Sequence, residues 1–137
     1  MKTHTLKFKI IGILALIVLF CVSYTLKTQN SKKKMMTHIV YFWAKPNLST
    51  TDKQKFEAGL SSLLKIKSLQ KGYVGKPAAT EARDVVDNSY DYSLILFFDD
   101  VKGHDAYQID PIHLKFIDEN KQYWTKVIVY DSDTMDF

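Results

Sequence analysis

The chain has 137 residues, which is enough for one domain with an appendage and too few for two ordinary domains. With 46% hydrophobic and 25% charged residues, its composition excludes a disordered or collagen-like protein. The net charge of +4 is unevenly distributed, because residues 1–35 contain seven lysines and no acidic residue. Residues 36–137 hold the other 12 basic residues and all 15 acidic ones, so we expect no nucleic-acid partner for this acidic part.

A stretch of 17 uncharged, mostly apolar residues runs from Ile10 to Leu26, between lysines on both sides. A basic start followed by an apolar stretch is typical of a secretory signal or an uncleaved signal-anchor. The stretch is longer than most signal hydrophobic regions and just reaches the length that spans a bilayer, so both interpretations stay open. We predict that residues 1–35 are a signal peptide or signal-anchor plus a polar linker, and that the protein is membrane-anchored or exported to the cell envelope.

Three alternatives bear on this segment. Translation starting at Met35 or Met36 would produce a cytoplasmic domain without the leader. A buried helix of a soluble domain is disfavoured by the flanking lysines, and a lipoprotein is disfavoured by Phe20 immediately before Cys21. Because Cys21 is the only cysteine, the chain has no intrachain disulfide and no cysteine-based metal site.

The first half of the remaining chain predicts a strand, a helix and a second strand. Residues 38–43 are β-branched or aromatic and apolar on both faces, which predicts a strand buried on both sides. Ser49 with an acidic residue three positions later is close to a capping box, and apolar residues then recur at near-helical spacing up to Leu69. This pattern predicts an amphipathic helix of roughly four to five turns. The glycines and proline of residues 72–77 favour a short, irregular strand at an edge.

The second half predicts a strand, a helical region and a last strand. Residues 92–98 form the clearest strand pattern of the chain. Asp100 is placed to cap a second helical region, which is interrupted at Pro111, and residues 126–130 predict the final strand. The order βαββαβ predicts an α+β, ferredoxin-like fold with a four-stranded antiparallel sheet and both helices on one face.

The other face of that sheet would still carry apolar residues, since three of the predicted strands are apolar on both faces. About 100 residues also make a marginal core for a domain on its own. We therefore expect a homodimer in which two sheets pack together and close a dimeric α/β barrel.

Two motifs resemble the stress-responsive dimeric α/β-barrel (Dabb) family. One is His38-Ile-Val-Tyr-Phe at the start of the first strand, and the other is Tyr107-x-x-x-Pro-x-His113-x-x-Phe116 in the second helical region. The resemblance covers essentially all of residues 36–132 and identifies residues 36–137 as a Dabb domain. It implies a ferredoxin-like dimer with a small cavity between each sheet and its helices. Most members have no established activity, and one plant branch cyclises linear polyketides with histidine and tyrosine side chains in that cavity.

The resemblance implies that His38, Tyr107 and His113 are the catalytic candidates. Asp110 stands where many members have a histidine, and Gly59 stands where the cyclase branch has a tyrosine. We expect Asp110, Gly59 and Phe42 to contact a ligand, with Gly59 making the cavity larger and less polar. Its missing hydroxyl makes polyketide cyclisation doubtful for this chain.

The spacing of these residues suggests chemistry of its own. His113 follows Asp110 by three residues and Tyr107 by six, so the three would share a face of a continuous helix. A carboxylate fixes the tautomer of a neighbouring imidazole, and an imidazole beside a tyrosine hydroxyl can move protons to or from a carbonyl compound. In the alternative, His113 has a structural hydrogen bond with Asp110 and Tyr107 fills the core. His104 is expected at the surface or in a helix cap.

Three functions are therefore compared. The first is a stress-related protein that binds a small apolar or aromatic ligand in a pocket lined by histidine and tyrosine. The second is a cofactor-free, cyclase- or lyase-like enzyme doing acid–base chemistry on a carbonyl or aromatic compound. The third is an interaction module tethered to a membrane. We expect no cofactor and no metal site, because Asp131, Asp133 and Asp136 lack an EF-hand pattern and no His-x-His or HExxH spacing is present.

Overall fold

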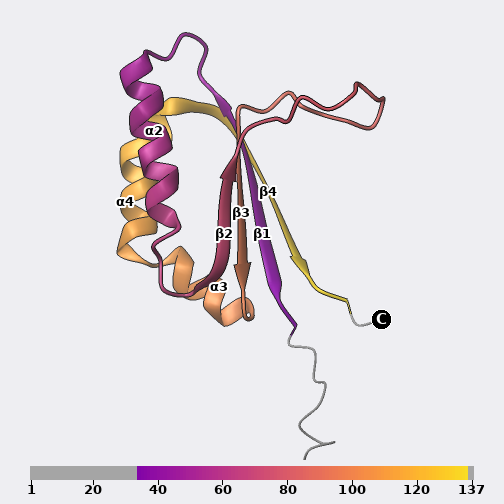
Figure 1. The fold of residues 1–137 in the computed structure, drawn as a ribbon. Helices are drawn as coiled ribbons and strands as arrows, with labels where there is room; N and C mark the ends of the chain where they lie inside the picture. Colours follow the sequence, from indigo (N-terminus) through magenta and orange to yellow (C-terminus); the bar gives the residue numbers. More distant parts are fainter. Residues whose placement is uncertain (1–33, 136–137) are drawn as a thin grey trace, which may run out of the picture. The chain divides into compact units, whose positions relative to one another are not determined.

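Four antiparallel strands form one sheet in the order β2-β3-β1-β4, and the helices cover one of its faces (Figure 1). The computed structural model describes residues 34–135. Its elements are β1 (Met36–Ala44), α2 (Thr50–Leu63), β2 (Leu69–Gly75), β3 (Tyr92–Phe98), α3 (Val101–Gln108), α4 (Pro111–Asn120), the 3-10 turn η1 (Lys121–Tyr123) and β4 (Trp124–Asp133). The predicted α+β, ferredoxin-like arrangement with a four-stranded antiparallel sheet is confirmed.

The predicted signal or anchor over residues 10–26 lies outside the described part of the chain, and so does most of the linker that follows it. Within residues 34–135, no helix combines the length and the apolar character that crossing a membrane would need. The leader and the domain boundary at residue 36 therefore stay predictions.

Strand β1 occupies the centre of the sheet, paired with β3 on one side and β4 on the other. Its side chains alternate, so that His38, Val40 and Phe42 are buried under the helices while the residues between them are half-buried on the opposite face. Because β1 is a central strand with neighbours on both sides, the side chains on both of its faces are at least partly buried, which explains their apolar character in the sequence.

The helix α2 begins where the sequence predicts and ends earlier. The Ser49 hydroxyl accepts the Asp52 backbone N–H at 3.1 Å and donates to the Asp52 carboxylate at 2.7 Å, which caps the first turn. The helix ends at Leu63, and Leu69, which the periodicity assigned to it, opens β2 and pairs with Phe98. The extension of the helix to Leu69 was wrong, because an apolar residue at the start of an edge strand happened to fall at helical spacing.

The second helical region consists of two separate helices. Asp100 caps α3 by accepting the Gly103 backbone N–H at 2.9 Å, as predicted. Asp110 caps α4 by accepting the Ile112 N–H at 2.8 Å, with Pro111 at the first helical position. A continuous helix from Tyr107 to His113 therefore does not exist.

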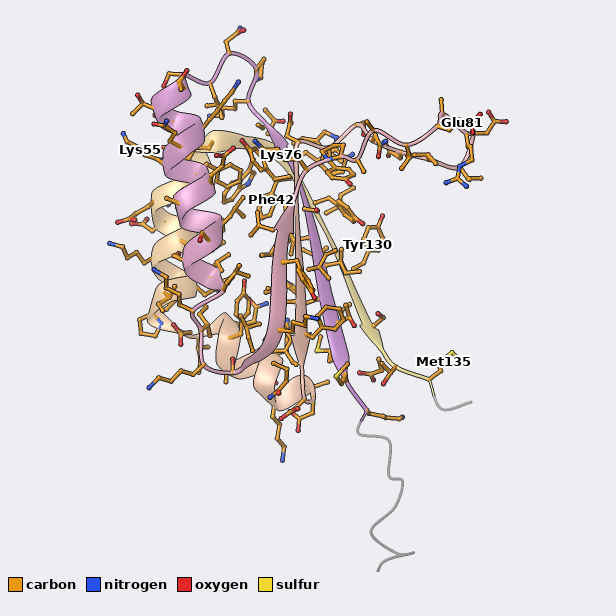
Figure 2. The ribbon with its side chains drawn as sticks, viewed as in Figure 1. Phe42, Lys55, Lys76, Glu81, Tyr130 and Met135 are labelled. Atoms are coloured by element: carbon orange, nitrogen blue, oxygen red, sulfur yellow. The ribbon has the colours of Figure 1, made fainter. Side chains whose placement is uncertain are left out.

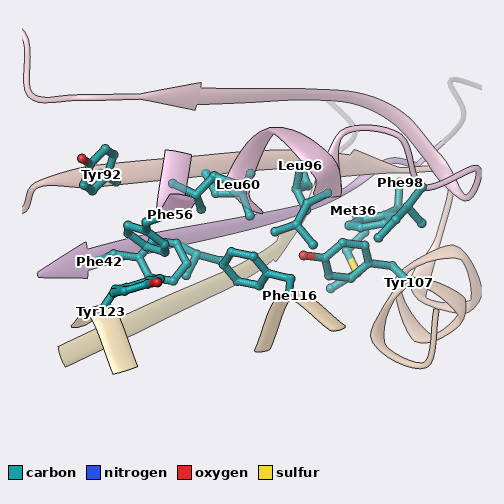
Figure 3. Close-up of a cluster of buried hydrophobic side chains, with 14 residues drawn as sticks. Met36, Phe42, Phe56, Leu60, Tyr92, Leu96, Phe98, Tyr107, Phe116 and Tyr123 are labelled. Carbon is teal, nitrogen blue, oxygen red and sulfur yellow. The ribbon is translucent and has the colours of Figure 1, made fainter. Parts of the chain in front are cut away.

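Aromatic and aliphatic side chains fill the space between the helices and the sheet (Figures 2 and 3). Phe56 of α2 is fully buried and packs with ring-centroid distances of 5.5 Å to Phe42 and 5.1 Å to Tyr92. Tyr107 and Phe116 bring α3 and α4 into the same core. Residues 76–91, which connect β2 to β3, project away from this body, with Glu81 at the tip in Figure 2.

The face of the sheet away from the helices is also rich in apolar residues. Ile95 and Phe97 of β3 lie on this face, while Leu94 and Leu96 lie under the helices. Tyr41 contacts Tyr90 and Tyr130 here, with ring centroids 4.7 and 6.3 Å apart. We call this surface the helix-free face; its apolar members are Ile39, Tyr41, Trp43, Tyr73, Ile95, Phe97, Ile128 and Tyr130.

Candidate functional site

A cavity of about 200 Å³ lies between the helix-covered face of the sheet and helices α3 and α4. Most of its walls are apolar, and its polar groups come from β1 and from the α3–α4 region. The lining residues are His38, Val40, Phe42, Leu63, Leu94, Tyr107, Gln108, His113, Phe116, Ile117, Trp124, Val127 and Val129. The structure therefore brings four of the residues that we singled out, His38, Phe42, Tyr107 and His113, to one small cavity.

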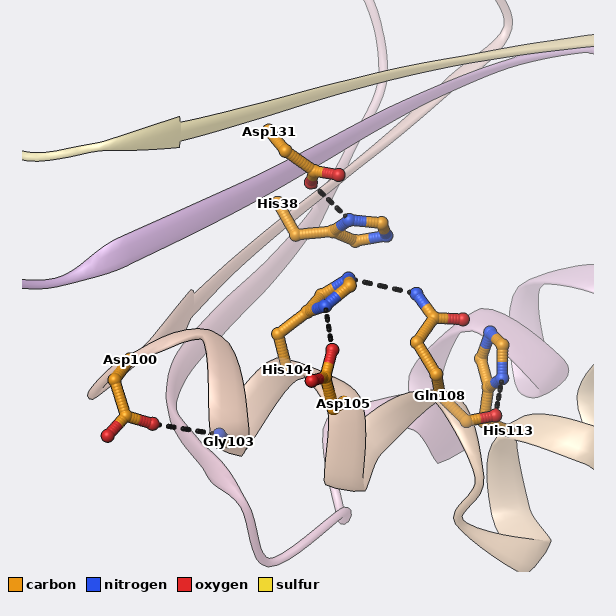
Figure 4. A network of polar contacts seen from close by, with 8 residues as sticks. All are labelled: His38, Asp100, Gly103, His104, Asp105, Gln108, His113 and Asp131. Atoms are coloured by element: carbon orange, nitrogen blue, oxygen red, sulfur yellow. Dashed lines mark hydrogen bonds and ion pairs between the residues drawn. The ribbon is translucent and has the colours of Figure 1, made fainter.

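His38 enters the cavity from β1 and is 5% exposed. Its Nδ1 lies 2.7 Å from a carboxylate oxygen of Asp131, which faces it across the β1–β4 pair (Figure 4). Because the carboxylate can only accept, Nδ1 carries the proton and Nε2 has the lone pair. Burial lowers the pKa of His38, and the hydrogen bond and charge of Asp131 oppose that effect only in part.

Tyr107 lies close to both histidine candidates, His38 and His113. Its ring centroid lies 5.9 Å from that of His38 and 4.5 Å from that of His113. The side chain is 1% exposed, and burial raises the pKa of its hydroxyl well above the usual range. Tyr107 therefore keeps its proton at physiological pH, and its hydroxyl is able to donate a hydrogen bond.

His113 sits in the first turn of α4 and is held by the end of α3. Its Nδ1–H donates to the backbone carbonyl of Gln108 at 3.0 Å, which leaves Nε2 as the acceptor. Burial lowers the pKa of His113, so the ring is neutral near pH 7. A neutral imidazole with one fixed N–H can take up a proton at its other nitrogen.

Asp110 does not have the expected hydrogen bond to His113. Its carboxylate caps α4, and the Gln108 carbonyl takes the place of the partner that we assigned to it. The expectation assumed a continuous helix, and Pro111 starts a new one. Asp110 is also absent from the cavity lining, although its charge is close enough to raise the pKa of His113 slightly against the effect of burial.

Gly59 lies away from this cavity, in a separate groove between α2 and α4. A Cβ on Gly59 would come within 2.8 Å of the side-chain amide of Asn120, which is buried and bonded to the Phe116 carbonyl. The missing side chain therefore makes room for Asn120. Gly59 therefore does not enlarge the cavity that holds His38, Tyr107 and His113, and the ligand contact expected for it stays a prediction.

Sequence reasoning missed three polar residues around His38. Asp131 pairs with it from the last strand, and His104 lies below it with ring centroids 5.0 Å apart (Figure 4). Gln108 follows His104 by one helical turn, and its amide nitrogen lies 3.0 Å from His104 Nε2. His104 was expected at the surface or in a cap, yet its side chain is only 13% exposed. The spacing of His104, Tyr107 and Gln108 at three and four residues was the signal that places them on one helix face.

The comparison with known families decides the classification of this chain. Residues 36–134 match the sequence profile described as the stress responsive A/B barrel domain, or Dabb. The chain belongs to the Dabb family. No curated protein sequence matches this Dabb chain significantly.

Solved structures similar to this Dabb chain share its fold at low sequence identity. A hydroxynitrile lyase from Passiflora edulis aligns with a TM-score of 0.65 and 18% identity, covering 77% of this chain and 97% of that one. A Dabb family protein with a ferredoxin-like fold from Mesorhizobium loti aligns with a TM-score of 0.61 and 17% identity over 75% and 99% of the two chains. A dimeric ferredoxin-like protein of unknown function from Thermobifida fusca gives 0.61 and 17% over 78% and 97%.

Proposed function

We propose that this Dabb protein binds a small apolar or aromatic ligand with a polar oxygen, in the cavity between the sheet and helices α3 and α4. The observation that carries the proposal is the convergence of His38, Tyr107 and His113 on one mainly apolar cavity. The family description connects Dabb domains with stress responses, which supports a stress-related role for the bound ligand.

The walls of the cavity favour an apolar body. Val40, Phe42 and Leu94 line it from the sheet, Trp124 lines it from the start of β4, and Phe116 lines it from α4. Binding here would remove the apolar surface of a ligand from water, which favours binding by about 25 cal/mol for each Å² of surface buried. The volume of about 200 Å³ fits a ligand of one aromatic ring and not an extended chain.

The polar groups favour an oxygen at one end of the ligand. The protonated Tyr107 hydroxyl is a donor, and His113 Nε2 is an acceptor. A ligand hydroxyl or carbonyl beside them would form hydrogen bonds that a hydrocarbon cannot replace.

A ligand screen on the full-length protein in detergent micelles tests this proposal. Trp124 lines the cavity while Trp43 lies on the helix-free face, so tryptophan fluorescence reports both unfolding and occupancy. We expect a phenolic or aromatic carbonyl compound to raise the melting temperature of the wild type and to leave that of His113→Ala unchanged. Lys115→Ala, on the same helix with an exposed side chain, is the matched control and should respond as the wild type. Equal responses of wild type and His113→Ala would contradict the proposed site.

A second candidate function is acid–base catalysis at the same cavity. It is favoured by the fixed tautomer of His113, which leaves Nε2 free to act as a base. The Tyr107 ring lies close by, with its centroid 4.5 Å from that of His113, and its hydroxyl can act as the acid. In this reaction His113 would take a proton from the ligand while the Tyr107 hydroxyl stabilises the developing charge on a carbonyl oxygen. Such positioned proton transfer is worth about 10²–10⁴ in rate. The hydroxynitrile lyase from Passiflora edulis shows that an enzyme can use this fold.

Turnover assays with a series of aromatic hydroxynitriles separate the two functions. A catalytic site predicts turnover by the wild type and a loss of about 100-fold or more in kcat for Tyr107→Phe, which keeps the shape of the ring. Binding without turnover of any of these compounds would favour the binding protein over the enzyme.

We also propose that the chain forms a homodimer through the helix-free face. Similar structures from Thermobifida fusca and Bacteroides fragilis are described as dimeric ferredoxin-like proteins. The apolar residues of the helix-free face give this chain a surface that a second copy would cover.

For residues 1–35 we propose a membrane anchor or export signal, as the sequence predicts. Fractionation of cells expressing the full chain should place it in the membrane or outside the cytoplasm. A version that starts at Met35 should stay in the cytosol. Full-length protein found only in the cytosol would refute the leader.

A further inference from the structure

We propose that His38, His104 and Asp131 form a binding site for a divalent transition metal, with Zn²⁺ as the fitting ion. The three side chains come from β1, α3 and β4, and one ligand atom of each lies within 4.8 Å of the other two. The site adds to the proposed function, which uses Tyr107 and His113, and shares only His38 with it. Spacing along the sequence could not indicate it, because each ligand comes from a different element.

The geometry is close to what such an ion requires. Zinc binds histidine nitrogen and carboxylate oxygen at about 2.0–2.2 Å, so its ligand atoms lie roughly 3–4 Å from one another. His38 Nδ1 and Asp131 are already 2.7 Å apart, and the rings of His38 and His104 are 5.0 Å apart between centroids. An ion bound to His38 Nδ1 and Asp131 would replace the proton between them, and the neutral His38 ring would then carry its proton at Nε2. Figure 4 shows His38 between Asp131 and His104. Side-chain rotations that move ligand atoms by about 1 Å would close the set around an ion.

His104 has the tautomer that a metal ligand needs. The Gln108 amide N–H donates to Nε2 at 3.0 Å, so Nε2 has the lone pair, and Nδ1 faces the Asp105 carboxylate at 3.4 Å. An imidazole that binds an ion through one nitrogen commonly donates its other N–H to a carboxylate, which fixes the ring. The ion would take the place of the Gln108 amide at Nε2.

Charge and access also fit a cation. Asp131 supplies a negative charge and is 45% exposed, so an ion can reach the set from solvent. His38 and Gln108 line the cavity of the proposed function, which leaves water or the Gln108 amide oxygen as the fourth ligand.

The ligand types select the class of metal. Two imidazoles and one carboxylate suit Zn²⁺, Co²⁺ and related first-row ions, whereas Ca²⁺ and Mg²⁺ prefer sites made entirely of oxygen. We therefore expect Zn²⁺ and Co²⁺ to bind, and Mg²⁺ to compete poorly.

Competition against a chromophoric zinc chelator tests the site on the metal-free, full-length protein in detergent, purified without a histidine tag. We expect one Zn²⁺ per chain and a loss of affinity of at least about tenfold in both His104→Ala and Asp131→Asn. Asp131→Asn preserves the shape of an exposed side chain, so a loss in this variant does not reflect misfolding. Co²⁺ added to the wild type should give a visible absorption band that both variants lose.

His113→Ala is the matched control, because it removes a histidine of the same cavity that is outside the ligand set. It should bind Zn²⁺ with the affinity of the wild type while losing the ligand response of the proposed function. Absence of Zn²⁺ binding by the wild type, or equal binding by His104→Ala and Asp131→Asn, would overturn the metal site. Either result would leave the binding role of Tyr107 and His113 intact.

Discussion

The two faces of the same sheet differ in what covers them. Under the helices, Leu94, Leu96 and Phe98 are 1% exposed or less, and the polar candidates sit among them. On the helix-free face, the alternate residues of the same strand, Ile95 and Phe97, are only half-buried. Because successive side chains of a strand point to opposite faces, one apolar strand contributes both to the buried core under the helices and to an uncovered apolar surface on the other face.

This difference explains why the candidate site lies on the helix-covered face. The pKa of His38 is lowered and that of Tyr107 is raised because helices exclude water from them. The helix-free face carries apolar and aromatic residues and, within residues 34–135, none of the histidines that we discuss. We therefore propose ligand binding for the covered face and association for the other.

Leu96→Lys should have the largest effect, because it places a charge in the core under the helices. Leu96 is fully buried, and an unpaired ammonium group in its place costs several kcal/mol. That is comparable with the whole stability of a domain of this size. We expect loss of the folded state in far-UV circular dichroism and thermal melting. A cooperative melt near that of the wild type would show that the core is not where the structure puts it.

Ile95→Lys sharpens the comparison from the other face. Leu96, the next residue, points into the core. Ile95 is half-buried in the single chain and would lie against the second copy of the proposed dimer. We expect a folded protein that sediments as a monomer, because a charge would be buried in the dimer interface. A folded dimer with unchanged sedimentation would refute association through this face.

Gly59→Ala tests the packing of the helix layer that covers the site. The new methyl group would meet the Asn120 amide at 2.8 Å, at an overpacking cost of about 1–3 kcal/mol. Alanine gains only about 1 kcal/mol in helix propensity, so urea unfolding should show a less stable protein. Gly103→Ala, where the nearest atoms are 3.6 Å away, is the control and should be neutral or stabilising. Equal effects of the two substitutions would contradict the tight contact.

The smallest expected effect is a pH dependence that originates on the covered face. The pKa values of His38 and His113 lie below the unfolded value of 6.5, so the unfolded chain binds more protons as the pH falls below it. Stability is therefore complete above about pH 6.5 and declines on acidification through the folded pKa values. His38→Gln should flatten this decline in urea midpoints measured between neutral pH and about pH 5. The Glu57 carboxyl, with a pKa lowered from 4.5 by hydrogen bonds from Lys76 and Tyr92, acts only at lower pH.

Local signals in the sequence predicted most of the fold. The strand at residues 92–98 has the predicted bounds, and the caps at Ser49 and Asp100 are where their side chains indicate. Each of these features depends on residues a few positions apart. Leu69 shows the limit of such patterns, because the pairing with Phe98, and not periodicity, decides its structure.

The candidate site was less predictable because its contacts are long-range. His38, Tyr107 and His113 could be named from motifs, but the partner of each could not. Asp131 reaches His38 only through the β1–β4 register, and the Gln108 carbonyl reaches His113 only because the helix breaks before Pro111.

The contact between His38 and Asp131 has a consequence for how the protein is made. The two residues are 93 positions apart and belong to the first and the last strand along the chain, which are neighbours in the sheet. Pairings between distant segments form late and slowly. During synthesis, β1 has an open edge until residues 124–133 emerge from the ribosome, and an unpaired edge invites association with other chains. The imidazole–carboxylate contact can form only after β4 has been synthesised, so a shorter nascent chain lacks both the β1–β4 pair and the pocket residues that β4 supplies, Trp124, Val127 and Val129.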